Sequence, residues 1–231
     1  MKIHGLQKMT LLDFPGRVAC TVFLGGCDMR CPFCHNAELI DGSAPPVMEE
    51  EELLAFLKKR QGLLEGVAVT GGEPLLRPDI TGLLEKIRDL GYPVKLDTNG
   101  THPDRLREII SRSLVSYVAM DIKNSPDRYA VTAGLEKMDL GPVRESVILL
   151  MEGKTDYEFR TTTVAELHDA DSFRGIGEWI RGAERYYLQK FTDRDTVPFG
   201  GFHAPSDDNM REYLAITREY VPAAEFRGMT D

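Results

Sequence analysis

The 231-residue sequence contains only four cysteines, one tryptophan, no long apolar segment and no excess of basic residues. Its apolar stretches are far shorter than the roughly 20 residues that a membrane-spanning helix needs, so we expect no membrane association. A net charge of −9 disfavours nucleic acid as the main ligand, since that ligand needs a basic surface. The N-terminus does not resemble a signal peptide, and clustered free thiols suit a reducing compartment, so we expect a cytoplasmic protein.

Three of the four cysteines, Cys27, Cys31 and Cys34, lie within eight residues and follow the apolar run 18–24. Three thiolates with this spacing can hold three irons of a [4Fe-4S] cluster, whereas electron-transfer clusters of this kind use four cysteines. The fourth iron is then open to another ligand. A structural zinc site is the alternative, but zinc needs four ligands and the chain has no second cysteine pair. Cys20 is interpreted as a buried strand residue.

Short β-branched runs alternate with amphipathic helical patterns along the whole chain, which is typical of βα units and a parallel sheet. The predicted strands number six, too few for a closed eight-stranded barrel. We therefore predict an α/β fold, a partial (open) (β/α)6 TIM-type barrel with a lateral mouth, formed as one domain over residues 1–231. The expected strands cover about 18–24, 67–69, 94–97, 115–121, 157–164 and 186–191.

Unusual polar residues follow these strands in succession. Functional residues of parallel α/β folds gather at the carboxyl ends of the strands, so we expect these side chains to meet. The residues concerned are Cys27, Cys31, Cys34, Gly71, Gly72, Glu73, Asp97, Thr98, Asn99, Met120, Asp121, Lys123, Arg160 and His203.

Two of these segments resemble the motifs of the radical S-adenosylmethionine (SAM) superfamily: the cysteine segment 27–34, with the aromatic Phe33, and the Thr-Gly-Gly-Glu-Pro segment 70–74. Segments 6–16 and 34–36 narrow the resemblance to glycyl-radical-enzyme activases. Among these, the chain is most similar to the activating proteins of anaerobic ribonucleoside-triphosphate reductase. The resemblance covers nearly the whole chain and implies the radical SAM core fold.

The resemblance implies a reaction and a set of partners. A [4Fe-4S] cluster on the three cysteines cleaves SAM reductively, with an electron from a flavodoxin or ferredoxin-type donor. The resulting radical removes the α-hydrogen of a glycine in a glycyl radical enzyme. The protein itself contributes binding, orientation and exclusion of water.

The resemblance also implies roles for individual residues. It places a monovalent cation, Na⁺ or K⁺, on Asp97, Thr98, Met120 and Asp121, as in formate-lyase activases. Other interpretations stay open: Asp97 could cap a turn, Lys123 and Arg160 could form ion pairs, and His203 could be a surface residue. The expected cofactor-binding residues are Phe33, Gly71, Gly72, Glu73, Asp97, Asp121, Lys123, Arg160 and His203.

Three alternative functions are weighed against the reductase activase. One is an activase of a pyruvate formate-lyase type enzyme, and another is a non-catalytic zinc-binding interaction module. The third is a radical SAM enzyme acting on a small molecule such as a deazapurine precursor. Enzymes of that third kind resemble this chain in size, but typically show a Gln-Gly-Glu-Gly stretch before the cluster and an acidic residue after it. This chain has Asp-Phe-Pro-Gly at 13–16 and His-Asn at 35–36 instead.

Overall fold

A curved eight-stranded sheet forms the centre of the computed structural model, which describes residues 1–228. The strand order is β10-β9-β8-β7-β6-β5-β3-β2, and every neighbouring pair is parallel except β2 and β3. The strands are β2 (Gly5–Thr10), β3 (Ala19–Leu24), β5 (Gly66–Gly71), β6 (Val94–Thr98), β7 (Tyr117–Asp121), β8 (Asp156–Thr163), β9 (Tyr186–Lys190) and β10 (Ala224–Arg227). A separate antiparallel pair joins β1 (Lys2–Ile3) and β4 (Met48–Glu49).

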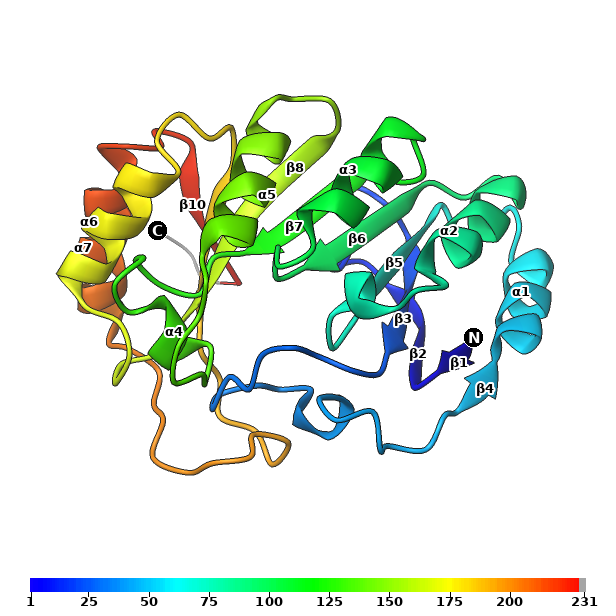
Figure 1. Cartoon of the computed structure of the whole chain (residues 1–231), viewed down its shortest axis with the longest axis horizontal. Helices are drawn as coiled ribbons and strands as arrows, with labels where there is room; N and C mark the ends of the chain where they lie inside the picture. Colours follow the sequence, from blue (N-terminus) through cyan, green and yellow to red (C-terminus); the bar gives the residue numbers. More distant parts are fainter. Residues whose placement is uncertain (229–231) are drawn as a thin grey trace.

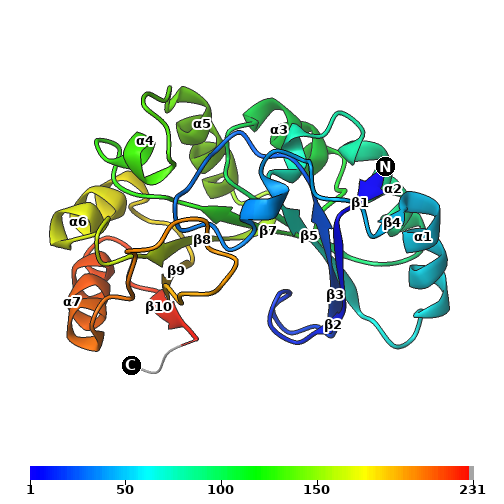
Figure 2. The ribbon, with the colours of Figure 1, turned by 90° about the horizontal axis from the view of Figure 1, so that it is seen from below.

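The helices lie along the outer, convex side of this sheet, and the sheet forms an arc with β2 and β10 at its two ends (Figures 1 and 2). The α-helices are α1 (Glu50–Lys59), α2 (Ile80–Asp89), α3 (Pro103–Ser111), α4 (Tyr129–Thr132), α5 (Gly141–Met151), α6 (Ala170–Trp179) and α7 (Asp207–Arg218). Two 3-10 helices, η1 (Ala37–Leu39) and η2 (Pro74–Leu76), interrupt the loops. The predicted open α/β barrel is confirmed.

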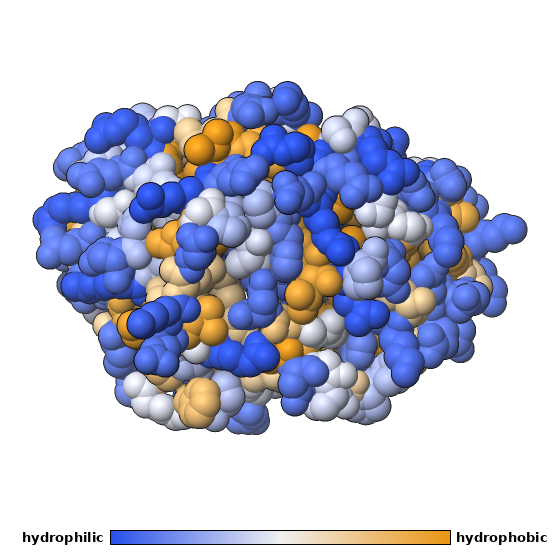
Figure 3. Space-filling model, viewed as in Figure 1, coloured by the Kyte–Doolittle hydropathy of each residue, from blue (hydrophilic) through white to orange (hydrophobic). Residues whose placement is uncertain are grey.

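Apolar stripes on the helices and the buried strands build the core. In α2, the stripe Ile80, Leu83, Leu84 and Ile87 is fully buried, as its helical spacing predicts. Apolar and hydrophilic side chains are interspersed on the face shown in Figure 3. Within residues 1–228, no helix is long and apolar enough to cross a membrane.

The two edge strands, β2 and β10, were not predicted. β2 carries exposed polar residues and its register shifts between Gln7 and Thr10, so it lacks the regular alternation that marks a strand. β10 is only four residues long. A strand of that length gives too little pattern to be distinguished from a loop.

β10 is held against the sheet by a buried ion pair inside the barrel. Arg227 donates to both carboxylate oxygens of Glu158, 2.7 Å to the Oε2 atom, and the Tyr117 hydroxyl donates to the same oxygen at 2.7 Å. The Glu158 side chain is wholly buried. Burial by itself raises the pKa of this carboxyl, but Arg227 and Tyr117 lower it below its usual value.

Arg227→Met should therefore destabilise the protein by roughly 3 kcal/mol, because it leaves a buried carboxylate without its counter-charge. Arg211→Met is the control, since Arg211 pairs with Asp208 in solvent and should contribute less than about 1 kcal/mol. Urea unfolding of both variants measures the difference. Equal losses of unfolding free energy in the two variants would show that the Glu158–Arg227 pair does not stabilise the β10 edge of the sheet.

Candidate active site

A cavity of about 220 Å³ opens at the carboxyl ends of the central strands. It brings together most of the predicted site residues, although they come from distant parts of the sequence. Glu73, Met120 and His203 are the predicted residues that do not line it. Those that do are Cys27, Cys31, Phe33, Cys34, Gly71, Gly72, Asp97, Thr98, Asn99, Asp121, Lys123 and Arg160.

The three clustered thiols are largely withdrawn from solvent. Burial raises the pKa of Cys27 to about 12 and raises the pKa values of Cys31 and Cys34 as well. The free thiols are therefore protonated at neutral pH, and binding a metal must release their protons. Cys20, by contrast, lies fully buried in β3 and does not line the cavity.

Cys27, Cys31 and Cys34 surround one cavity. Among residues 1–228, no group of three His, Cys, Asp or Glu side chains is arranged to hold a single metal. A zinc ion needs such an arrangement, whereas a four-iron cluster takes each thiolate at a different iron. The arrangement of Cys27, Cys31 and Cys34 around one cavity fits the cluster.

Gly71, the last residue of β5, and Gly72 pack directly onto the backbone that leads to Cys27. Gly72 N–H donates to the Leu24 carbonyl at 2.9 Å, and Glu73 N–H donates to the Gly26 carbonyl at 2.7 Å. A Cβ atom at Gly71 would lie 2.2 Å from the Leu24 oxygen, and one at Gly72 would lie 2.1 Å from the Gly26 oxygen. Gly71 also has a φ of +128°, which favours glycine. These contacts require glycine at both positions independently of any cofactor.

Glu73, which follows β5, is hydrogen-bonded to the end of β6. Its buried carboxylate accepts hydrogen bonds from Leu75 N–H (2.9 Å), the Thr98 hydroxyl (2.9 Å) and Asn99 N–H (2.6 Å). Burial raises its pKa to about 7 in spite of these donors. Glu73 therefore supports the end of β6, and it is placed to orient the site rather than to face into the cavity.

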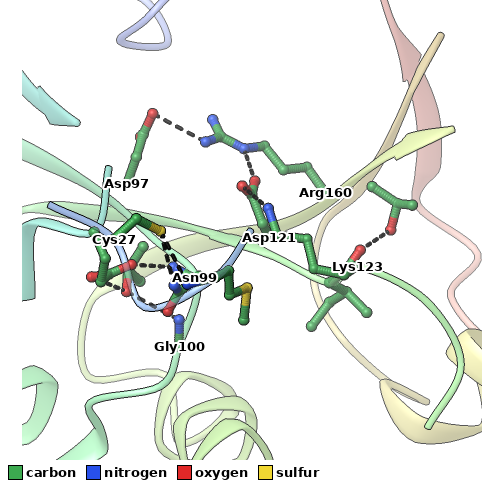
Figure 4. Close-up of polar contacts among 12 residues, drawn as sticks. Cys27, Asp97, Asn99, Gly100, Asp121, Lys123 and Arg160 are labelled. Atoms are coloured by element: carbon green, nitrogen blue, oxygen red, sulfur yellow. Dashed lines mark hydrogen bonds and ion pairs between the residues drawn. The ribbon is translucent and has the colours of Figure 1, made fainter. Parts of the chain in front are cut away.

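The Asn99 side chain links the end of β6 to the cysteine loop. Its amide nitrogen donates to Asp28 Oδ1 at 2.7 Å and lies 4.0 Å from the Cys27 sulfur (Figure 4). Thr101 donates to the other Asp28 oxygen at 2.6 Å, and His102 Nε2 lies 3.2 Å from it. Burial by itself raises the Asp28 pKa, but these neighbours lower it to about 2. Sequence reasoning placed Asn99 at the site but gave Asp28 no role, because only the fold brings the two side chains together.

A buried chain of ion pairs crosses the barrel at the cavity (Figure 4). Arg160 donates to Asp121 Oδ1 at 2.5 Å and to Asp97 Oδ2 at 3.1 Å. Lys123 donates to Asp121 Oδ2 at 2.8 Å, and Lys95 pairs with Asp97 Oδ1. Burial by itself raises the Asp97 and Asp121 pKa values, but the cations, Arg160 foremost, lower both below their usual value. Lys123 and Arg160 thus form ion pairs and also line the cavity.

The other expected cation ligands are engaged elsewhere. The Thr98 hydroxyl donates to Glu73 and accepts from Gly100 N–H at 3.1 Å. Met120 is fully buried, and its side chain packs against Gly100. The monovalent cation site stays a prediction.

A second, larger hollow of about 1170 Å³ adjoins the cavity. It shares His35, Arg160, Thr162 and Gln189 with the first cavity. The predicted site residue His203 lies at this hollow, where its Nδ1 atom pairs with Glu166 at 2.6 Å and its side chain is 74% exposed. His203 is therefore separated from the cysteines.

The comparison with known families decides the superfamily. Residues 21–174, which are 154 of the 231, match the profile of the Radical SAM superfamily. The chain belongs to this superfamily. Membership of this superfamily implies a [4Fe-4S] cluster and SAM as cofactors. The buried thiols fit the cluster, and the glycine turn beside them fits SAM.

Three curated relatives show the range of the similarity. A Methanocaldococcus jannaschii protein, provisionally named a glycyl-radical enzyme activating enzyme, is 27% identical over 228 residues, 95% of this chain and 92% of its own length. The pyruvate formate-lyase-activating enzyme of Clostridium pasteurianum is 31% identical over 131 residues, 54% of each chain. A 7-carboxy-7-deazaguanine synthase of Hyperthermus butylicus is 38% identical over 96 residues, 41% of this chain and 40% of its own.

A solved structure shares this architecture. Streptococcus suis SuiB, bound to its precursor peptide SuiA, superposes with a TM-score of 0.70 at 16% identity. The match covers 90% of this chain and 48% of SuiB. This likeness concerns the fold alone.

Gly72→Ala should disrupt the cysteine loop and with it the cluster, because even one methyl group would collide with the Gly26 carbonyl. We expect iron content and visible absorbance after anaerobic reconstitution to fall at least severalfold. Gly82→Ala is the control, since a Cβ on that residue of α2 meets nothing within 4 Å. Full cluster occupancy in Gly72→Ala would show that the loop does not depend on this close approach.

Proposed function

We propose that this radical SAM enzyme is a glycyl-radical-enzyme activase and that its partner is an anaerobic ribonucleoside-triphosphate reductase. One observation carries the proposal: the hollow of about 1170 Å³ opens directly beside the cysteine cavity and shares residues with it. A hollow of this size offers room for a polypeptide segment. The match to the M. jannaschii protein over 95% of the chain supports the same class.

The cavity residues divide into two roles. The thiolates of Cys27, Cys31 and Cys34 would hold the cluster, and a flavodoxin or ferredoxin-type protein would be its electron donor. With SAM bound, the cluster would supply the chemistry of reductive SAM cleavage and of hydrogen-atom removal from a C–H bond. The remaining cavity residues orient SAM and exclude water around it.

The residues fit the chemistry of SAM. The Lys123 and Arg160 cations suit its carboxylate, and the backbone at Gly71 and Gly72 suits close approach of its amino acid moiety. Phe33 is held as an apolar wall by an edge-to-face contact with Phe191, at 6.4 Å between ring centroids. Asp97 and Asp121 fix the orientation of Arg160 and Lys123.

Two exposed apolar side chains at the hollow offer a contact surface for a polypeptide segment. Leu11 and Leu12 line the hollow and are 69% and 84% exposed, although both are large apolar residues. Their exposure follows from the next two residues: Asp13 accepts a 2.5 Å hydrogen bond from Thr21, and Phe14 is buried. The anchored turn holds both leucines toward solvent, where a partner segment would cover them.

His203 also lines the hollow, and we propose that it faces the partner segment rather than SAM.

A radical SAM enzyme acting on a small deazapurine precursor is the second candidate, because deazaguanine synthases share part of the sequence. That similarity spans 96 residues and leaves more than half of the chain unmatched. An activase function, unlike turnover of a small molecule, also accounts for the large hollow and the exposed leucines.

Each of the three single substitutions Cys27→Ala, Cys31→Ala and Cys34→Ala should abolish cluster assembly and SAM cleavage, because the cluster then keeps only two protein ligands. Cys20→Ala is the matched control. It should keep both properties and lose about 1–2 kcal/mol of stability from a small change in core packing. Iron analysis and 5′-deoxyadenosine production measure the outcome. Loss of the cluster in Cys20→Ala, with retention in any of the other three, would refute the ligand assignment.

The activase is tested by incubating the reduced protein with SAM and an anaerobic ribonucleotide reductase. We expect a glycyl-radical doublet in electron paramagnetic resonance. Isolated glycine peptides should react poorly, since ordering a free peptide in the hollow costs entropy. A pyruvate formate-lyase serves as the comparison partner and should give a weaker signal. Turnover of a deazapurine precursor without any protein radical would support the second candidate instead.

A further inference from the structure

The four carboxylate oxygens of Asp97 and Asp121 are all occupied by cationic side chains. Arg160 bridges the two residues, Lys123 takes the second oxygen of Asp121, and Lys95 takes the second oxygen of Asp97. The bonds with Arg160 and Lys123 are 2.5–3.1 Å long. Figure 4 shows how Arg160 lies between the two aspartates. These are the carboxylates on which the resemblance places a monovalent metal ion.

Lys95 owes its position to the strand it shares with Asp97. Residues two apart on a strand point to the same face, so both side chains of β6 point into the barrel. Lys95 is only 1% exposed, and its pairing with Asp97 compensates the burial of its charge. Neither sequence motif includes Lys95.

The three cationic side chains already neutralise the charge of the two aspartates, so no metal ion is needed to balance it. Lys95, Lys123 and Arg160 bring three positive charges to two carboxylates, so the group is already positive by one. A sodium or potassium ion would have to displace one of these nitrogens and would be repelled by the others.

We propose that Lys95 supplies at Asp97 the positive charge that a monovalent metal ion supplies in formate-lyase activases. The enzyme then binds SAM without Na⁺ or K⁺. Lys95 is a positioning residue in this proposal, since it acts through Asp97 and Arg160. The inference rests on the proposed SAM site, and it replaces the metal ion that the resemblance implies.

The first test uses the unmodified, anaerobically reconstituted protein. SAM is titrated calorimetrically in choline chloride, sodium chloride and potassium chloride of equal ionic strength. Choline is too large to enter a site for a small ion, so it serves as the metal-free reference. We expect the three affinities to agree within twofold. A fivefold or greater gain with Na⁺ or K⁺ would overturn the proposal, whereas no binding in any salt would contradict the proposed function itself.

The second test creates the missing site. Lys95→Met frees one Asp97 oxygen and removes one charge, so SAM affinity should fall at least tenfold in choline and recover at least threefold with Na⁺ or K⁺. Broadening of the ²³Na resonance should accompany the recovery and be absent in the unmodified protein. Lys95→Arg keeps the charge and should stay indifferent to the salt.

Lys154→Met is the matched control for this series. Lys154 also pairs with an acidic residue two positions away, Glu152 at 2.7 Å, but this pair lies in solvent. The control should bind SAM like the unmodified protein in all three salts. If Lys95→Met does the same, Lys95 has no part in the site and the proposal fails.

Discussion

The site depends on the close backbone packing between the glycine turn after β5 and the loop that carries Cys27. Gly72 and Glu73 donate hydrogen bonds to the carbonyls of Leu24 and Gly26, and the glycines leave no room for a side chain between the two segments. The Glu73 carboxylate then extends the contact to the end of β6. Three strand ends are thus fixed relative to one another, and the place of the cysteines follows from them.

The second determinant is the set of charges inside the barrel. A closed barrel fills its interior with apolar side chains. This open barrel carries two groups of buried ion pairs instead. Asp97, Asp121 and their cations lie at the cavity, and Glu158 pairs with Arg227 of the edge strand β10. These pairs let polar groups line a hollow without leaving charges uncompensated. The cavity can then be lined by charged groups, while the exposed Leu11 and Leu12 lie at the adjoining hollow.

Sequence reasoning reached the fold and the main cavity residues because both leave local signals. The apolar spacing of α2 and the cysteine spacing can each be read within about ten residues, and the rule on strand ends places the motifs together. It missed β10 because that strand has only four residues, the Asn99–Asp28 contact because the two residues lie on separate loops, and Lys95 because neither motif includes it. It also could not tell that the glycines meet the cysteine loop or that His203 lies at the outer hollow.

The central claim is that three cysteines hold a cluster whose fourth iron is left for SAM. Electron paramagnetic resonance of the reduced cluster, recorded while SAM is added, tests this claim most directly. The account predicts that the g-values shift and that the shift saturates at one SAM per cluster. Electron–nuclear coupling to ¹⁵N or ¹⁷O in the amino acid moiety of labelled SAM should appear with the shift. An unchanged spectrum under conditions in which SAM binds would contradict the open iron and the site built around it.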